Sequence, residues 1–417
     1  MRAVRFDVSV PGFLLTKSAG RLTEWAVTGA PSGLSLADVP APELLGPRWV
    51  GLRVIACGVC GSDVSAIWMA QSMRLEPFSS FPAVLGHEVL AEVTEVGAEV
   101  SKLEVGQRVV VDPFLGCAAR QRKPACPSCE TGRHATCERT GDEGPLERDG
   151  RPLARGGIVG YHRDLPGGWS ERMVAHEDHV FVVPEGVPDR AAVLTEPLAV
   201  SMHAVLQAPP QPGQQVLVIG SGPIAFATIW ALRAAGFEGT VVAQVKRERE
   251  QALARALGAT EVVRPGAEAE EALERTGARA YTPQLGPKVY AGGGFDVVYD
   301  CVGTQQSLQQ ALGAVRPRGR VGLLGCAAEL RRIDLSPVWS REVEIVGWVG
   351  YGRETWQGRA RHTFEVTLEA LRDRGVPHED LVTHVLPLER YREGLSAAAN
   401  RRASGAIKVV LSPTGSI

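Results

Sequence analysis

The sequence predicts an α/β protein of two domains, a β-rich domain followed by a doubly wound parallel sheet. The chain has 417 residues, and a single hydrophobic core rarely grows beyond about 250 to 300 residues. From residue 49 to 112, short runs alternate apolar and polar residues between Gly and Pro, which is typical of strands and turns. From residue 215 onward, apolar strand-like runs alternate with helical stretches such as 223–235 and 248–257, which is typical of βαβ units.

The composition indicates a globular protein that binds a small molecule. Apolar residues make up 44% of the chain, charged residues 22%, and the net charge is -2, so no charge excess points to nucleic acid or a membrane surface. The N-terminus lacks an apolar stretch of signal-peptide length, and no later run approaches the roughly 20 apolar residues that span a bilayer. We therefore expect a cytoplasmic protein with a small-molecule substrate, no nucleic-acid partner and no membrane contact.

Residues 113–170 combine Cys, Gly, Pro and charged residues with little periodicity, so this segment needs something other than an apolar core to hold it. Four of the eight cysteines lie close together here, in the positions Cys117, Cys126, Cys129 and Cys137. In a cytosolic protein such a cluster indicates a metal, and four thiolates form a closed tetrahedral zinc site with a structural role. We predict a structural zinc lobe over about residues 113–140. The alternative is four unrelated free cysteines.

Three further motifs supply ligands for a second metal. They are GVCGSD at 58–63, GHE at 86–88 and EPLA at 196–199, and the candidate ligands are Cys60, His87, Glu88 and Glu196. One thiolate, one imidazole and one or two carboxylates from separate loops suit a catalytic zinc that keeps an open position. Each residue also has an ordinary interpretation: a buried small residue for Cys60, a hydrogen-bonded core histidine for His87, and a helix cap for Glu196.

A glycine-rich turn separates a strand-like run, QVLVIG, from a helix-like run in the second domain. The turn reads GSGPIA at 220–225, and the candidate cofactor contacts are Gly220, Gly222, Pro223 and Ile224. The first glycine allows the tight turn, the second lets the backbone approach a pyrophosphate, and the helix N-terminus offers N–H groups to the phosphates. This context predicts a dinucleotide-binding domain of the Rossmann type. The alternative is an ordinary glycine turn.

The next predicted strand bears on the choice of cofactor. A site that prefers NAD usually ends this strand with Asp or Glu for the ribose hydroxyls, whereas here it ends at Gln244. Lys246 and Arg247 follow at once, and two cations suit a 2′-phosphate. NADP is therefore favoured over NAD, with an exposed helix start as the alternative interpretation of the two cations.

Together these motifs resemble the zinc-containing medium-chain dehydrogenases of the alcohol dehydrogenase superfamily, closest to the polyol, sorbitol, threonine and glucose dehydrogenase branch. GVCGSD, GHE, the cysteine lobe, GGWSERMV, EPLA and IGSGPI occur in this order over nearly the whole chain. The resemblance implies a GroES-like catalytic domain over 1–198, a Rossmann domain over 199–348, and a C-terminal segment, 349–417, that returns to the first domain. It also implies a homodimer or homotetramer.

The resemblance assigns roles to the motif residues. Cys60 and His87 would bind the catalytic zinc with either Glu88 or Glu196 as third ligand, because family members exchange these two carboxylates. Ser62 would pass on the substrate proton, and Asp63 would orient His87. The expected reaction is oxidation of a secondary alcohol of a polyol, sugar or cyclitol, or its reverse, with hydride transfer to or from NAD(P). Two zinc ions per chain are expected, one catalytic and one structural.

The chain departs from the family pattern at three places. Ser65 stands where the alcohol dehydrogenase branch often has a proton-relay histidine. Lys123 stands where the first structural cysteine is usual, so the assignment of Cys117 requires a loop that folds back. The chain also has an extra N-terminal stretch and an enlarged loop around 265–294.

Two other functions are compatible with the fold. One is a non-catalytic, zinc-stabilised dinucleotide-binding protein, and the other is a metal-free carbonyl or enone reductase of the same superfamily. The intact set of Cys60, Ser62, His87 and Glu196 argues against both.

Overall fold

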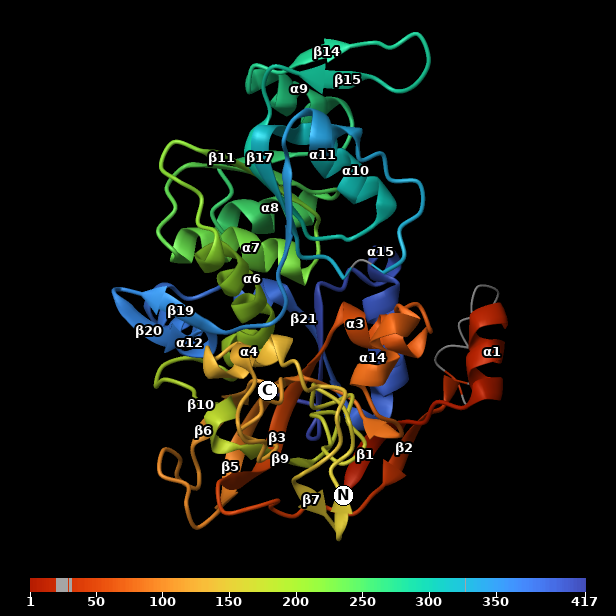
Figure 1. Ribbon diagram of the computed structural model, residues 1–417, viewed down its shortest axis with the longest axis vertical. Coiled ribbons are helices and arrows are strands. Elements are labelled where there is room, and N and C mark those ends of the chain that lie inside the picture. The colour runs from red at the N-terminus through yellow and green to blue at the C-terminus, as the bar shows by residue number, and fades with distance from the viewer. Residues whose placement is uncertain (20–28, 30–31, 327) are drawn as a thin grey trace. The chain divides into compact units, whose positions relative to one another are not determined.

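The computed structural model describes residues 1–19, 29, 32–326 and 328–417, and these form two compact units (Figure 1). The first unit comprises Met1–Glu196 and Tyr351–Ile417, and the second comprises Pro197–Gly350. The second unit is therefore continuous in sequence, whereas the first is made of two separate stretches of chain.

A seven-stranded sheet forms the centre of the first unit, with the strand order β10-β6-β5-β3-β22-β21 and β9 paired to β3 outside this path. The strands are β3 (Trp49–Val59), β5 (Glu88–Val96), β6 (Arg108–Val111), β9 (Arg172–His176), β10 (Val180–Val182), β21 (Val382–Pro387) and β22 (Lys408–Ser412). Because β22 pairs antiparallel with β3, with Val409 opposite Val59, Lys408 lies next to the end of β3, where the GVCGSD motif begins.

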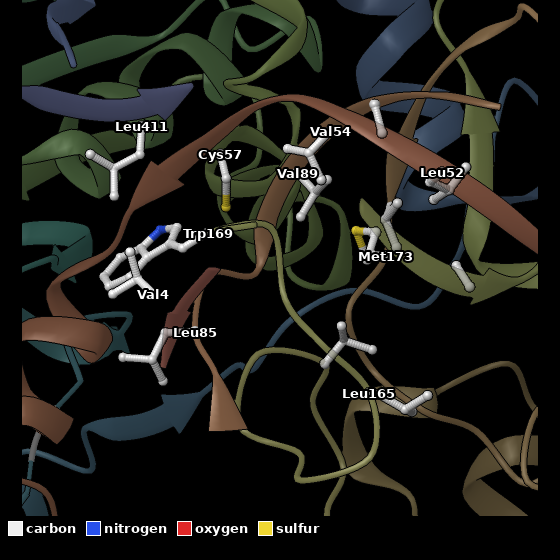
Figure 2. Packing of buried hydrophobic residues seen from close by; sticks show 14 of the residues in the cluster. Val4, Leu52, Val54, Cys57, Leu85, Val89, Leu165, Trp169, Met173 and Leu411 are labelled. Atoms are coloured by element: carbon white, nitrogen blue, oxygen red, sulfur yellow. The ribbon is translucent and has the colours of Figure 1, made fainter. Parts of the chain in front are cut away.

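The core of the first unit fixes the two loops that carry GVCGSD and GHE. Figure 2 shows this core, in which Val4 and Leu411 lie near the ring of Trp169. Trp169 is fully buried, and its ring N–H donates to the carbonyl oxygen of Gly58 at 3.2 Å. Its backbone N–H donates to Leu85 at 2.9 Å. One aromatic residue therefore connects the segment before Cys60 with the segment before His87.

Gly86 makes this close packing possible. Its φ is +96°, and a Cβ there would lie 2.4 Å from the Trp169 ring and 2.8 Å from the Cys57 sulfur. A side chain would meet both the steric penalty of positive φ and a collision with the core. The turn before His87 therefore requires a glycine at position 86.

The remaining elements of the first unit are short. A three-stranded sheet, in the order β2-β1-β4, contains β1 (Arg2–Phe6), β2 (Leu34–Asp38) and β4 (Ala83–Val84). The helices are α1 (Val10–Ala19), α3 (Gly61–Ile67), η2 (Met73–Phe78), η4 (Glu177–His179), α5 (Asp189–Ala192), α12 (Thr363–Arg374), α13 (His378–Leu381), η5 (Leu388–Arg390), α14 (Tyr391–Ala399) and α15 (Arg401–Ser404). The strands β19 (Arg353–Trp356) and β20 (Arg359–His362) form a hairpin.

The segment between β6 and β9 has little regular structure, as its composition predicts. Its elements are α4 (Pro127–Glu130), η3 (His134–Thr136), β7 (Glu147–Arg148) and β8 (Arg151–Pro152). We call residues 113–140 of this segment the cysteine lobe.

The second unit is a six-stranded, all-parallel sheet in the order β13-β12-β11-β16-β17-β18. Its strands are β11 (Gln215–Ile219), β12 (Thr240–Gln244), β13 (Glu261–Val263), β16 (Phe295–Asp300), β17 (Val315–Leu323) and β18 (Glu344–Gly347). The chain runs outward from β11 to β13 and then returns to the other side of β11 as β16. The carboxyl end of β11 is therefore the switch point at which open α/β sheets bind their ligands.

The helices of the second unit are α6 (Thr195–Gln207), whose first two residues belong to the first unit, α7 (Pro223–Ala234), α8 (Glu248–Ala256), α9 (Ala267–Arg275), α10 (Gln305–Ala314) and α11 (Ser336–Ser340). The segment around 265–294 contains α9 and a hairpin of β14 (Arg279–Tyr281) and β15 (Val289–Ala291), both visible in Figure 1. Within the described residues, no helix is long and apolar enough to cross a membrane.

Candidate functional site

Three of the candidate zinc ligands converge in the first unit. One ligand atom from each of Cys60, His87 and Glu88 lies within 4.8 Å of the other two. Cys60 is the N-cap of α3, while His87 and Glu88 lie where β5 begins. His87 and Glu88 are buried and Cys60 is partly exposed. A thiolate and an imidazole with partial access to solvent suit a metal that keeps one coordination position open.

The sequence CGSD positions these groups through a helix cap. Cys60 has extended backbone at the N-cap, and its amide N–H donates to Oδ2 of Asp63 at 2.9 Å. A carboxylate at the third helical position that reaches back to the N-cap amide is a frequent device for starting a helix. The cap thus holds the thiol of Cys60 at the start of α3.

Asp63 also contacts the imidazole of His87. It is fully buried, and its Oδ1 lies 3.3 Å from Nδ1 of His87. Burial alone would raise the pKa of Asp63, but His87 and hydrogen bonds from His87, Tyr161 and the Cys60 amide lower it below its ordinary value. The carboxylate therefore stays ionised and faces Nδ1, which leaves Nε2 of His87 for a metal.

Tyr161 is a site residue that the sequence did not indicate. Its hydroxyl donates to Oδ1 of Asp63 at 2.7 Å and lies 3.2 Å from Oγ of Ser62. Burial, followed by the charge of Asp63, raises the pKa of Tyr161 well above its ordinary value, so the phenol stays neutral. Nearly a hundred residues separate Tyr161 from Asp63, and no motif around Tyr161 reveals the contact.

Glu88 forms a buried ion pair. Nζ of Lys408 donates to both carboxylate oxygens of Glu88 at 2.7 Å, and the two side chains are 2% and 1% exposed. Burial opposes the charge of the ammonium group, but Glu88 keeps the pKa of Lys408 above its ordinary value. A Cβ at Gly58 would lie 1.8 Å from Oε2 of Glu88, so any larger residue at this position would collide with the carboxylate. The only sequence signal was a lysine within the apolar run AIKVVLSP.

Glu196 does not belong to the group of ligand atoms around Cys60. It lies in the first turn of α6, where Oε1 accepts a hydrogen bond from the hydroxyl of Tyr351. Burial, followed by the charge of Glu88, raises the pKa of Glu196 to about 7. The charges of the two carboxylates thus repel each other in a buried site, and His87 and Lys408 offset only part of this effect on Glu196. The thiol of Cys60, the imidazole of His87 and these carboxylates are donors that fit a divalent cation.

The four cysteines of the cysteine lobe also come together. All four sulfur atoms lie within 4.8 Å of one another, with 3.8 Å between Cys117 and Cys137 and 3.9 Å between Cys126 and Cys137. Four thiolates about 2.3 Å from a tetrahedral zinc ion lie roughly 3.8 Å apart. The amide of Cys117 also donates to the sulfur of Cys129 at 3.3 Å. The geometry fits zinc, and the sulfur of Cys117 lies in the group although Lys123 stands at the usual first position.

The glycine-rich turn of the second unit lies at the switch point of its sheet. Gly220 has a φ of +135° and follows β11, Gly222 is the N-cap of α7, and Pro223 is the first residue of that helix, followed by Ile224. The amide of Gly220 donates to the carbonyl oxygen of Gln244 at 3.2 Å. The turn therefore lies beside the end of β12.

Lys246 and Arg247 follow directly after β12, and both are exposed. Arg247 is the N-cap residue of α8 and forms an ion pair with Glu250 at 2.8 Å. Lys246 is thus the first cation beyond the strand that adjoins the glycine-rich turn.

Comparisons with known proteins agree on one family. Residues 46–185 match the model of the alcohol dehydrogenase GroES-like domain, and residues 223–371 match that of the zinc-binding dehydrogenase. An L-idonate 5-dehydrogenase from Vitis vinifera is 31% identical over 88% of this chain and 88% of its own. A sorbitol dehydrogenase from Arabidopsis thaliana is 30% identical over 88% of this chain and 89% of its own.

The fold is similar to the crystal structure of galactitol-1-phosphate dehydrogenase from Escherichia coli. The TM-score is 0.72 at 22% identity, with 99% of this chain and 100% of that chain covered. The predicted combination of a GroES-like domain and a Rossmann domain is thereby confirmed.

Proposed function

The chain belongs to the zinc-containing medium-chain dehydrogenases, in their polyol dehydrogenase branch, and on this basis we propose that it oxidises a secondary alcohol of a polyol or sugar derivative at a centre formed by Cys60 and His87. As a member of this family it is an alcohol dehydrogenase that uses NAD(P). The convergence of Cys60, His87 and Glu88 is the observation that carries the proposal.

Cys60 and His87 would hold the catalytic zinc. When bound, zinc supplies a Lewis acid that lowers the pKa of a coordinated hydroxyl well below its ordinary value, as it lowers that of bound water to about 7 in the most favourable case. Asp63 would keep His87 in the orientation and tautomer that a metal ligand needs, because its buried carboxylate faces Nδ1.

Glu88 and Glu196 are both candidates for the third ligand, and their partners differ. Glu88 would have to leave a buried ammonium group that contacts both of its oxygens. Glu196 has a tyrosine hydroxyl as its partner, and burial, followed by the charge of Glu88, raises its pKa. We therefore assign Glu196 as the resting ligand and Glu88 as the residue that can replace it.

Ser62 would take the proton of the substrate hydroxyl at Oγ. It is partly exposed, as is Ser65, which stands at the position of the missing relay histidine. A proton at Ser62 can therefore pass to water on this side without a relay histidine. Tyr161 would hold Ser62 in place, because its neutral hydroxyl is fixed by Asp63.

The other parts of the proposal concern the cofactor and the assembly. Gly220, Gly222, Pro223 and Ile224 would contact the dinucleotide, and Lys246 and Arg247 would favour NADP through its 2′-phosphate. Two zinc ions per chain are proposed, the second in the cysteine lobe. A cytoplasmic location and a homodimer or homotetramer are proposed from the family resemblance.

The names of two relatives, an idonate and a sorbitol dehydrogenase, support substrates that carry several secondary hydroxyls. The test is reduction of NADP and NAD by purified protein with a panel of sugar acids, alditols, cyclitols, primary alcohols and enones. Oxidation of a polyol or sugar acid that is lost in Cys60→Ser supports the proposal. Reduction of enones that survives in Cys60→Ser, with no polyol oxidised, contradicts it and favours a metal-free reductase.

A further inference from the structure

Asp112 belongs to a third group of possible metal ligands in the first unit. Four of the nine histidines of the chain gather here, in the positions His134, His176, His179 and His362. One ligand atom from each of Asp112, His134 and His179 lies within 4.8 Å of the other two. None of these residues belongs to the cysteine set or to the centre at Cys60, and no sequence motif pointed to them.

The carboxylate of Asp112 is buried and faces two imidazoles. Oδ1 accepts the amide N–H of Phe114 at 2.8 Å, while Oδ2 lies 3.2 Å from Nε2 of His362 and 3.8 Å from Nδ1 of His179. Nitrogen and oxygen ligands at about 2.0 to 2.2 Å from a tetrahedral ion lie roughly 3.4 Å apart. The spacing of Asp112 and His179 thus needs only a small adjustment to hold a metal.

Two of the histidines already use their ring nitrogens. Nδ1 of His362 accepts the amide N–H of Phe364 at 3.2 Å, so Nε2 carries the proton that points at Asp112. The ring of His362 also stacks on Phe181 with 4.5 Å between the ring centroids. Nδ1 of His176 accepts the amide N–H of Asp178 at 3.3 Å. His362 is therefore placed to orient the Asp112 carboxylate rather than to bind an ion itself.

The other two histidines have ring nitrogens to offer. Nδ1 of His134 and Nδ1 of His179 are buried and have no hydrogen-bond partner within the part of the chain that the structure describes. The centroids of their rings lie 4.9 Å apart. Buried nitrogens without partners are rare because desolvation is not compensated.

We propose that Asp112, His134 and His179 bind a zinc ion at a third site. Two imidazoles and one carboxylate form a donor set that zinc accepts in proteins, with a fourth position for water. His134 belongs to the cysteine lobe, Asp112 follows β6, and His179 ends η4. The ion would fasten the lobe to the seven-stranded sheet at a point separate from the four cysteines.

The first test compares the zinc content of purified wild-type protein with that of His134→Gln and His179→Gln, measured by mass spectrometry after addition of zinc and desalting. His378→Gln is the control, because it removes a histidine elsewhere in the same unit. Each of the two site variants should hold one zinc ion per chain fewer than the control. Equal zinc content in all four proteins overturns the proposal.

The second test needs no variant and therefore does not depend on whether one folds. Crystals of the wild-type protein grown with excess zinc are measured above and below the zinc absorption edge. An anomalous peak between Asp112, His134 and His179 is expected. A peak in the cysteine lobe with none beside Asp112 would mean a hydrogen-bonded His–Asp network without metal, which overturns the proposal. Neither test uses activity, so the outcome is independent of the proposed dehydrogenase function.

Discussion

Nζ of Lys408 lies 2.7 Å from both carboxylate oxygens of Glu88, and neither side chain is more than 2% exposed. The two residues are 320 positions apart in sequence and meet because β22 pairs with β3. In a buried pair of this kind, the mutual attraction of the two charges offsets the cost of taking both out of water. Removal of one partner leaves the other charge buried without compensation.

We therefore expect Lys408→Met to destabilise the protein by about 3 to 5 kcal/mol, the range measured when one partner of a buried ion pair is removed. Urea unfolding monitored by circular dichroism would measure the loss. The double variant Lys408→Met/Glu88→Gln should regain most of it, because no unpaired charge remains. If the double variant is as unstable as the single one, the destabilisation does not come from the stranded carboxylate.

Cys60→Ser should lower kcat by about a thousandfold or more, because loss of the metal removes several kcal/mol of transition-state stabilisation. Zinc content and the thermal unfolding temperature should be measured on the same sample, since the fold should persist. Cys326→Ser removes an exposed cysteine from the second unit and serves as the control. A near-normal kcat in Cys60→Ser would rule out the proposed role.

Ser62→Ala should lower kcat by about 10² to 10⁴, the usual contribution of a positioned proton-transfer group. Ser65→Ala is the matched control, because it lies in the same helix and is also partly exposed. Its kcat should stay within a few-fold of wild type if water replaces the relay histidine. An equal loss in both variants would show that the proton passes through Ser65 as well.

Lys246→Ala should raise the KM for NADP by about 10- to 100-fold, which corresponds to one charge-assisted hydrogen bond to a phosphate. The KM for NAD should change little. Arg249→Ala removes a nearby exposed cation and is the control. If Lys246→Ala leaves the KM for NADP unchanged, the cations after β12 merely begin an exposed helix.

The stability of the protein should fall as the pH falls from about 6.5 to about 4, in part because of His162. Nδ1 of this fully buried residue accepts the amide N–H of Asp164 at 3.1 Å, and Nε2 lies 3.0 Å from the carbonyl oxygen of Ala154. Burial lowers the pKa of His162 to about 4. Below about pH 6.5 the unfolded chain binds a proton that the folded chain excludes, so the contribution of His162 is complete only above that pH.

Urea unfolding at about pH 7 and about pH 4.5 would measure this effect, which is on the order of 2 to 3 kcal/mol for His162. Glutamine can accept and donate similar hydrogen bonds but does not titrate, so His162→Gln should lose less stability on acidification than wild type. His384→Gln, which removes a histidine that is partly exposed, should behave as wild type. An identical pH dependence in His162→Gln and wild type would contradict the assignment.

The regular parts of the fold were predicted well because local patterns determine them. The stretches 223–235 and 248–257 appear as α7 and α8, each ending one residue earlier, since apolar periodicity defines both and a proline begins α7. The segment around 265–294 was expected only as an enlarged loop, yet it contains α9, β14 and β15. Its strands are three residues long and largely exposed, so they carry no hydrophobic pattern.

The sequence motifs identified residues that the structure brings together, namely Cys60, His87 and Glu88 in one group and the four cysteines in another. The motifs could not identify the residues that contact these ligands. Tyr161 reaches Asp63, and Lys408 reaches Glu88, through the pairing of distant segments. Strand register and loop paths are set by the whole core, so a single sequence does not reveal them. The sequence did not predict the group around Asp112 either, because its members are single residues far apart in the chain and belong to no motif.

The division of the first unit into two stretches of chain has a consequence for folding during synthesis. The second unit, Pro197–Gly350, is continuous and can complete its parallel sheet as soon as it has left the ribosome. The first unit must wait for β22, which comes after the whole second unit, before the end of β3 at Cys57–Val59 gains its partner on that side. Until then Glu88 lacks the ammonium group of Lys408, and the unpaired edge at the end of β3 is open to wrong pairing. The part of the chain that is made first is thus the part that becomes native last.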